Sequence, residues 1–165
     1  GNGRWAQKRH LPRTVGHAKG AAIVRDLVDA CVKRGVKHLT LFAFSTENWK
    51  RPQDEVSTLM SLFVQYLGKE LDAMAREGVR LNVMGDKRAF PHTLQERIRQ
   101  AEELTKHNSA ITLNVAANYG GRWDIAQAVA QWFTQTRPAA ESVTPEAVER
   151  AIHSHLTRFV DSHGR

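Results

Sequence analysis

Apolar residues along this chain follow two spacings, one typical of strands and one typical of helices. Short continuous apolar runs predict buried strands, and apolar residues at helical spacing predict amphipathic helices between them. The predicted strands span 39–44, 79–84 and 111–117. The predicted helices span 17–34, 54–76, 91–107, 124–135 and 145–155. Strict alternation of strands and helices indicates an α/β fold with a mostly parallel central sheet, flanked by helices and joined by right-handed crossovers.

Three of the predicted helices have an apolar face that we expect to point inward. In the helix 54–76 this stripe fits either a core or the wall of a hydrophobic tunnel, since both need the same spacing. The polar, basic segment 1–13 before the first helix is predicted to be a loop. The residues expected to face inward are Ile23, Val24, Leu27, Val28 and Cys31, then Val56, Leu59, Met60, Phe63, Leu67, Leu71 and Met74, and finally Leu94, Ile98, Ala101 and Leu104.

Polar residues follow directly where each predicted strand ends. In open α/β sheets, ligands bind beyond the carboxyl ends of the strands. We therefore expect these polar residues to share one edge, although a solvated loop with a helix cap would also explain the first group. The three groups are Ser45, Thr46, Glu47, Asn48, Trp49 and Arg51, then Gly85 and Asp86, then Asn118, Tyr119 and Gly120.

The first residues of the chain have features of a phosphate-binding segment. Gly1 and Gly3 flank Asn2, and such a backbone can expose N–H groups to phosphate oxygens. Arg4 and Arg13 follow, and then come His17 and the predicted start of a helix, whose N-terminus favours an anion. The alternatives are a common turn and a helix-capping histidine. Together with the polar edge where the strands end and the hydrophobic helices beside it, this segment would suit an amphiphile with a phosphate head.

Composition narrows the class of protein. A chain of 165 residues with 41% hydrophobic residues is typical of one globular domain. The net charge of +7 indicates anionic partners. One cysteine, Cys31, fits a reducing compartment, and no apolar run approaches the ~20 residues of a membrane span, so a cytoplasmic location is expected. Because the chain opens on Gly-Asn-Gly without a methionine, we expect it to be part of a longer sequence.

Three motifs resemble signatures of the undecaprenyl diphosphate synthase family, the cis-prenyltransferases. They are GNGRW at 1–5, FSTENWKRP at 44–52 and NYGGRWDI at 118–125, and the resemblance extends to about residue 160. It implies a single cis-prenyltransferase-like domain over 1–165, incomplete at both ends, with a hydrophobic tunnel between sheet and helices. The implied reaction condenses isopentenyl diphosphate onto farnesyl diphosphate with cis geometry, giving a polyprenyl diphosphate precursor of a cell-wall lipid carrier. A Mg²⁺ cofactor, a homodimer and peripheral membrane contact for product release are also implied.

The resemblance also implies roles for individual residues. The allylic diphosphate would be held by the first motif and the residues after it, and the second motif would serve isopentenyl diphosphate and proton removal. Glu55 stands at the family's position for a carboxylate, and the third motif, through Gly121 and Arg122, would support the site. The implied substrate-binding residues are Gly1, Asn2, Gly3, Arg4, Trp5, Arg13, His17, Ser45, Glu47, Asn48, Trp49 and Arg51, with Ser45, Asn48 and Arg51 also catalytic.

Two family features have no counterpart in the sequence. The family's Mg²⁺-binding aspartate would precede Gly1, so no metal ligand is assigned. The family's carboxy-terminal motif for isopentenyl diphosphate is not recognisable, and that role is not transferred to Arg158 or Arg165. We therefore expect this chain by itself to bind farnesyl diphosphate weakly without turnover. The main alternative is a non-catalytic partner subunit; a nucleic-acid-binding module would instead show a basic stripe with exposed aromatic residues.

Overall fold

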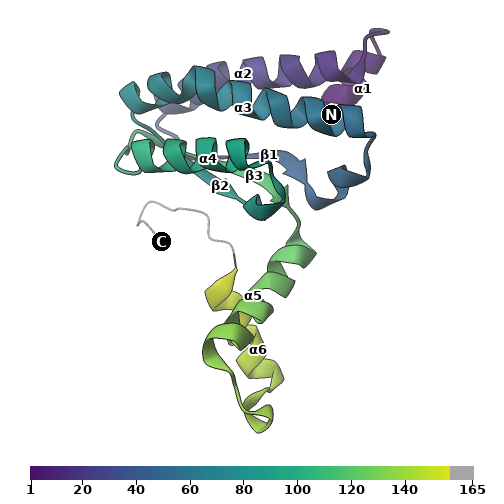
Figure 1. The fold of residues 1–165 in the computed structure, drawn as a ribbon. Helices are drawn as coiled ribbons and strands as arrows, with labels where there is room; N and C mark the ends of the chain where they lie inside the picture. Colours follow the sequence, from purple (N-terminus) through teal and green to yellow (C-terminus); the bar gives the residue numbers. More distant parts are fainter. Residues whose placement is uncertain (157–165) are drawn as a thin grey trace.

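Three parallel strands form the sheet, in the order β1-β3-β2 (Figure 1). The computed structural model describes residues 1–156, in which β1 spans His38–Ser45, β2 spans Val79–Met84 and β3 spans Ile111–Tyr119. Central β3 pairs in parallel with both neighbours. The parallel sheet expected from the sequence is thus confirmed, and all three carboxyl ends lie at one edge.

Helices α2 (Arg13–Lys33), α3 (Gln53–Arg76) and α4 (His92–Thr105) lie together on one side of the sheet (Figure 1). Strand side chains alternate between faces, and those of Leu81, Val83, Leu113 and Val115 join the same hydrophobic core as the three helices. The predicted boundaries of α3 and β2 agree with the structure within one residue. Within residues 1–156, none of the helices is both long and apolar enough to cross a bilayer.

Strand β1 is less buried than its apolar sequence predicts. Phe44 is only 3% exposed, but Phe42 is 62% exposed, and Leu39 and Leu41 are half-buried. The expectation of a buried strand was therefore wrong for most of β1. The physical reason lies in the packing, since β1 lines an apolar cavity, whereas α3 and α4 pack against β2, which lies at the other end of the strand order and is largely buried.

Parts of the predicted helix faces were also wrong. Ile23 and Leu27 of α2 are 51% and 39% exposed, and Leu104 of α4 is 56% exposed. Val28 is buried, and Val24 and Cys31 pack on the core as expected. Helix α2 has apolar residues on more than one side, and spacing alone does not say which side meets the sheet. In α4, Leu104 lies at the edge of the apolar stripe, and Thr105 beside it takes the buried position.

The amino-terminal segment is helical rather than a loop. Helix α1 (Asn2–Gln7) packs against α2, which begins at Arg13, four residues before the expected start. His17 consequently lies inside α2 instead of at its N-terminus. The idea that His17 marks a helix-dipole anion site is therefore corrected, and its position has to be argued from its contacts.

A pair of packed helices projects from the carboxyl end of β3 (Figure 1). Helix α5 spans Gly121–Thr136 and helix α6 spans Pro145–His155. The predicted cap of α6 is confirmed, since the Thr144 side chain accepts a hydrogen bond from the Ala147 N–H at 3.2 Å. Arg158 and Arg165 lie outside the described residues.

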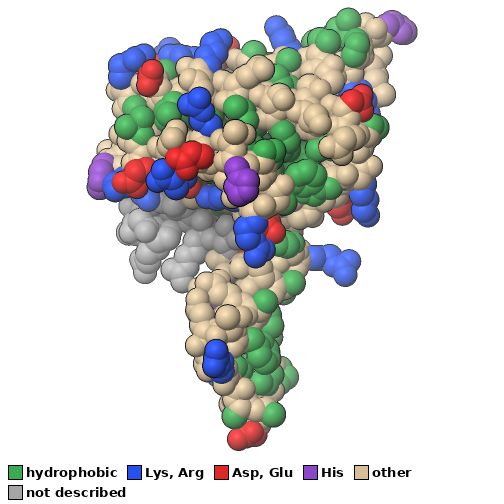
Figure 2. All heavy atoms as spheres, viewed as in Figure 1, with side chains coloured by type: hydrophobic (Ala, Val, Ile, Leu, Met, Phe, Trp, Pro, Cys, Tyr) green, Lys and Arg blue, Asp and Glu red, His purple; other side chains and the backbone are tan. Residues whose placement is uncertain are grey.

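Lys and Arg side chains are scattered among acidic and apolar ones on the face seen in Figure 2. They do not gather there into one stripe. Some basic side chains of the described residues pair with carboxylates, since Arg25 contacts Glu70 and Glu77, and Lys87 contacts Glu102. This face therefore lacks the pattern that a nucleic-acid-binding surface would show.

Candidate functional site

Two guanidinium groups and one imidazole converge on one carboxylate oxygen. Glu55, in the first turn of α3, accepts at Oε1 from Arg51 Nη1 at 2.8 Å and from Arg13 Nε at 3.4 Å. His17 Nε2 lies 3.0 Å from the same oxygen. Arg13 and His17 are four residues apart, so they meet Glu55 from the same face of α2. Arg51 comes from the turn that enters α3, so residues from two separate stretches of the chain meet here.

The Glu55 cluster has an excess of positive charge. Glu55 is 8% exposed, and burial alone would raise the pKa of its carboxyl group. The hydrogen bond from His17 and the charges of Arg13 and Arg51 act against burial, so the pKa is lowered overall. One ionised carboxylate thus faces two guanidinium groups, which leaves an anion-attracting site.

Helix α1 lies so close to α2 that glycine is required between them. A Cβ added to Gly16 would overlap the Asn2 carbonyl oxygen, and one added to Gly20 would overlap the Asn2 side chain. The Arg13 guanidinium likewise lies against Gly3, 3.0 Å from where its Cβ would be. This packing brings the predicted residues Asn2, Gly3, Arg13 and His17 together.

The polar residues at the strand ends also meet, as the parallel topology predicts. Trp49 donates its indole N–H to Asn118 Oδ1 at 2.7 Å, and Asn118 Nδ2 donates to the Asp86 carbonyl at 2.8 Å. Asn118 adopts a left-handed backbone (φ 52°), a conformation that asparagine tolerates better than most residues. At the end of β1, the Ser45 N–H donates to Asn48 Oδ1 at 3.1 Å. The turn containing Asn48 and Trp49 is thereby tied to the ends of β2 and β3.

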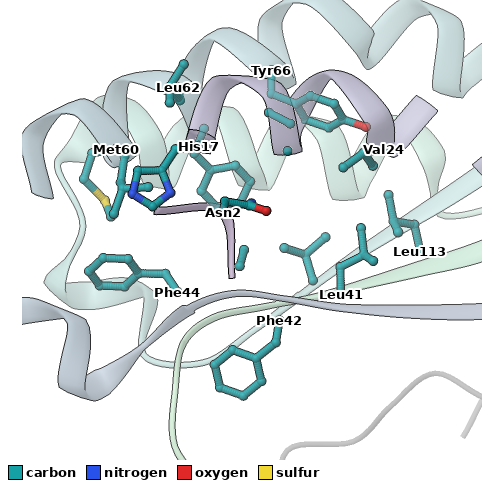
Figure 3. Close-up of a pocket in the computed structure, with 16 residues that line it drawn as sticks. Asn2, His17, Val24, Leu41, Phe42, Phe44, Met60, Leu62, Tyr66 and Leu113 are labelled. Carbon is teal, nitrogen blue, oxygen red and sulfur yellow. The ribbon is translucent and has the colours of Figure 1, made fainter. Parts of the chain in front are cut away.

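An apolar cavity of about 300 Å³ opens beside the Glu55 cluster, between α2, α3 and β1 (Figure 3). Asn2 and His17 contribute polar atoms to its lining, and the remaining lining side chains are largely apolar. The half-buried residues Leu59 and Phe63 line this cavity while also packing on the core, so the stripe on α3 serves both purposes. The other lining residues are Gly20, Ala21, Val24, Leu41, Phe42, Ala43, Phe44, Met60, Leu62, Tyr66, Leu113 and Val115.

Tyr66 separates this cavity from a polar cluster further along α3. Its ring lines both the apolar cavity and a smaller pocket that contains Arg25, Glu70 and Glu77. Burial, with a smaller contribution from Glu70, raises the pKa of Tyr66 to about 12, so its phenol stays neutral. Arg25 donates to Glu70 at 3.0 Å and to Glu77 at 2.6 Å, which joins α2 to α3.

Some predicted site residues lie elsewhere. Arg4, Trp5 and Glu47 are exposed and line neither the cavity nor the Glu55 cluster, and Trp5 instead stacks under the Arg9 guanidinium at 4.3 Å. Gly1 is exposed, with open space around it.

Sequence reasoning missed several residues that shape this region. It overlooked the close-packing Gly16 and Gly20 and the cavity-lining Tyr66. The two glycines lie four apart within a helix, a spacing that signals close helix approach; the position of Tyr66 left no comparable signal.

The described residues do not fit a Mg²⁺ site. Mg²⁺ prefers several oxygen ligands, often one or two carboxylates. Within residues 1–156, no group of three or more His, Cys, Asp or Glu side chains is placed to hold a metal. Glu55, the carboxylate of the cluster, faces cationic side chains that would repel a metal ion.

Residues 1–162 match the protein-family model described as "Putative undecaprenyl diphosphate synthase". A ditrans,polycis-undecaprenyl-diphosphate synthase ((2E,6E)-farnesyl-diphosphate specific) from Haemophilus ducreyi is 48% identical over 155 residues, covering 92% of this chain and 64% of the relative. An isoprenyl transferase from Nitrosomonas europaea is 50% identical over 152 residues, covering 92% of this chain and 58% of the relative. The chain thus spans about three fifths of the length of these curated relatives.

A solved structure supports the same relationship. Lavandulyl diphosphate synthase from Lavandula x intermedia, in complex with dimethylallyl diphosphate, matches with a TM-score of 0.81 at 27% sequence identity. The match covers 94% of this chain and 66% of that one.

Proposed function

This chain belongs to the undecaprenyl diphosphate synthase family, and from that membership we propose that it acts in cis-prenyl chain elongation. The reaction condenses isopentenyl diphosphate onto farnesyl diphosphate with cis geometry and lengthens the prenyl chain. The polyprenyl diphosphate product would serve as a precursor of the lipid carrier for cell-wall synthesis. Residues 1–165 would belong to one domain of this enzyme.

The observation that supports this function most directly is the contact between a cationic cluster and an apolar cavity. His17 belongs to both, since it bonds to Glu55 and lines the cavity. A prenyl diphosphate has a matching form, with a strongly anionic head on an apolar tail. Each charge-assisted contact to the head stabilises binding by roughly 1.5–3 kcal/mol, and each buried CH₂ of the tail adds about 0.8 kcal/mol.

Within this proposal, the residues of α1 and α2 hold the allylic diphosphate. Arg13 and His17 supply charge-assisted donors, and Asn2 and the Gly3 backbone complete the cradle. Arg4 and Trp5 belong to the same group by motif, although their side chains would have to turn towards the head. The cavity between α2, α3 and β1 takes the prenyl tail.

The turn after β1 is proposed to serve the second substrate. Ser45, Asn48 and Arg51 would position isopentenyl diphosphate and assist removal of its proton, with Trp49 shaping the pocket and Glu47 at its rim. The hydrogen bond from Trp49 to Asn118 supports this assignment, because it holds the turn in one place.

Mg²⁺ is proposed as the cofactor of the reaction on the basis of family membership alone. Because the described residues do not fit a Mg²⁺ site, we assign none of them to the metal. A homodimer, a cytoplasmic location and peripheral membrane contact for product release are likewise proposed for the enzyme. Light scattering and vesicle flotation would test the dimer and the membrane contact.

The function can be tested with the full-length gene product. We expect incubation with farnesyl diphosphate, labelled isopentenyl diphosphate and Mg²⁺ to give elongated prenyl products. Arg13→Ala should weaken binding of farnesyl diphosphate about ten- to a hundredfold. The exposed Arg99, which pairs with Glu96 on α4, provides a matched control in Arg99→Ala. Folded protein that binds farnesyl diphosphate without elongating it would favour a non-catalytic partner subunit instead.

A further inference from the structure

Glu55 is a buried carboxylate in the proposed diphosphate site, although diphosphate carries charge of the same sign. Its three partners all meet a single oxygen, Oε1, at 2.8, 3.0 and 3.4 Å. They approach from α2 and from the turn before α3, which are separate parts of the chain. Glu55 itself is fixed in the first turn of α3, next to the buried Val56.

Each arginine commits only part of its donor capacity to Glu55. A guanidinium group has five N–H donors. Arg13 uses Nε on Glu55, and Arg51 uses Nη1. The Arg13 guanidinium lies flat against Gly3 of α1, where the proposed diphosphate cradle lies, and its Nη atoms make no hydrogen bond within residues 1–156.

We propose that Glu55 is a positioning residue that holds Arg13, His17 and Arg51 in register, so that their remaining donors face an incoming diphosphate. This inference rests on the proposed function of the cluster as the diphosphate-binding site. Without the carboxylate, the partly exposed guanidinium groups of Arg13 and Arg51 would lie close together beside the His17 imidazole with no counter-charge between them, and like charges repel. Arg13 and Arg51 would then move apart and lose the alignment that a diphosphate requires.

A competing role for Glu55 would be that of an internal anion that the substrate displaces. The donor count argues against this role, because the arginines can keep their bond to Glu55 and still bind phosphate oxygens. The charge count agrees, since one carboxylate does not neutralise two guanidinium groups. The two roles predict opposite changes in affinity when the negative charge is removed.

The test compares Glu55→Gln, which keeps the shape and removes the charge, with Asp54→Asn. Asp54 is the exposed carboxylate one residue earlier in the same helical turn, and its side chain makes no ion pair within residues 1–156. Calorimetry with inorganic diphosphate should show binding to Glu55→Gln weakened about ten- to a hundredfold, the equivalent of one charge-assisted hydrogen bond. Asp54→Asn should bind as the wild type does.

Two further measurements separate positioning from a general loss of structure. Binding of farnesol, which has the tail without the diphosphate, should be unchanged in Glu55→Gln. Glu55→Asp, which restores the charge on a shorter side chain, should recover part of the diphosphate affinity. Equal loss of farnesol and diphosphate binding would overturn the positioning role.

The remaining outcomes are decisive as well. Unchanged or tighter diphosphate binding by Glu55→Gln, with wild-type binding intact, would refute the inference and leave the proposed function standing. A wild-type protein that binds no diphosphate would instead refute both. If Glu55→Gln does not fold, the Arg13 Nε–H resonance of the wild-type protein decides the question. Positioning predicts that this resonance stays protected from exchange when diphosphate saturates the site, and loss of protection would show displacement.

Discussion

Strands β1 and β3 are neighbours with similarly apolar sequences, yet they differ sharply in burial. In the pairing of Phe42 with Ala116, the β1 residue is 62% exposed and the β3 residue 2% exposed. Strand β3 is buried from Ile111 to Asn118. Strand β2 also has β3 on one side within residues 1–156, yet it is largely buried because α3 and α4 pack against it, whereas β1 lines the apolar cavity. The burial of a strand therefore follows from what packs against its faces, which its own sequence does not specify.

The same contrast extends to the helices above the sheet. On the side of β2 and α4, Leu94, Ile98 and Ala101 are fully buried. On the side of β1 and α2, the packing instead encloses a cavity of about 300 Å³. Protein interiors are normally close-packed, and apolar cavities reduce stability. The side of β2 and α4 thus stabilises the fold, and the side of β1 and α2 keeps the space that the proposed function needs.

The largest effect should come from truncating a side chain on the close-packed side. Leu94→Ala should lower the free energy of unfolding by about 2–5 kcal/mol, because a fully buried leucine leaves a new cavity. Leu59→Ala should cost less, about 1–2 kcal/mol, since Leu59 is half-buried and already faces a cavity. Urea unfolding followed by circular dichroism measures both. Equal losses would show that the two sides are packed alike.

A matched pair of glycines tests the close contact between α1 and α2. Gly16→Ala should lower the free energy of unfolding by about 1–3 kcal/mol, because the new methyl group would overlap the Asn2 carbonyl oxygen. Gly68→Ala, on an open face of α3, should raise it by about 0.5–1 kcal/mol through lower backbone entropy in the unfolded chain. Gly16→Ala should also weaken diphosphate binding, and normal binding would separate α1 from the site.

The fold could be predicted where a local pattern matches the final packing. Helix α3 and strand β2 have one apolar stripe each, so their boundaries were right. Ile23 was misplaced because α2 has apolar residues on more than one side, and Leu104 was misplaced because it lies at the edge of the α4 stripe, beside the buried Thr105. Helix α1 has six residues and no periodic pattern, and its contacts with α2 depend on tertiary packing that its sequence does not reveal.

The site was predictable to a similar extent. Parallel topology brings Ser45, Asp86 and Asn118 to one edge. The shared face of Arg13 and His17 was not predicted, because Arg13 was expected in a loop and lies instead at the start of α2. The convergence on Glu55 could not be predicted, since its contacts with Arg13 and His17 join residues 42 and 38 positions apart. Only the packing of α2 against α3 creates that contact.

A smaller effect is expected where the β1 turn meets the well-packed strands. Trp49→Phe removes the indole donor to Asn118 and should lower the free energy of unfolding by about 1 kcal/mol. Trp132→Phe is the control, because the Trp132 indole makes no hydrogen bond within residues 1–156 and packs on Phe133. Chemical denaturation of both variants measures the difference. Equal losses would mean that ring size, rather than the hydrogen bond, determines the result.

The smallest expected effect is the acid dependence of the Glu55 cluster. The partners of Glu55 lower the pKa of its carboxyl group below the ordinary value of 4.5 despite the opposing effect of burial. A lowered folded-state pKa means that the ionised carboxylate contributes stability above the unfolded-state value, and that this contribution is lost as pH falls through the folded-state value. Stability should therefore be compared between the wild type and Glu55→Gln from pH 5.5 downwards.

The difference in unfolding free energy between these two proteins should stay constant from pH 5.5 to about the ordinary glutamate value and shrink below it. Other carboxyl groups, including Asp86 with its own lowered pKa, titrate in both proteins and cancel in the comparison. Asp54→Asn, measured in the same way, should show no such convergence with the wild type. A difference that stays constant to the lowest pH at which both proteins remain folded would show that Arg13, His17 and Arg51 gain no stability from the charge of Glu55. Packing against α1 and α3 would then hold the cluster together, and the side of β1 and α2 would gain no stability from this charge.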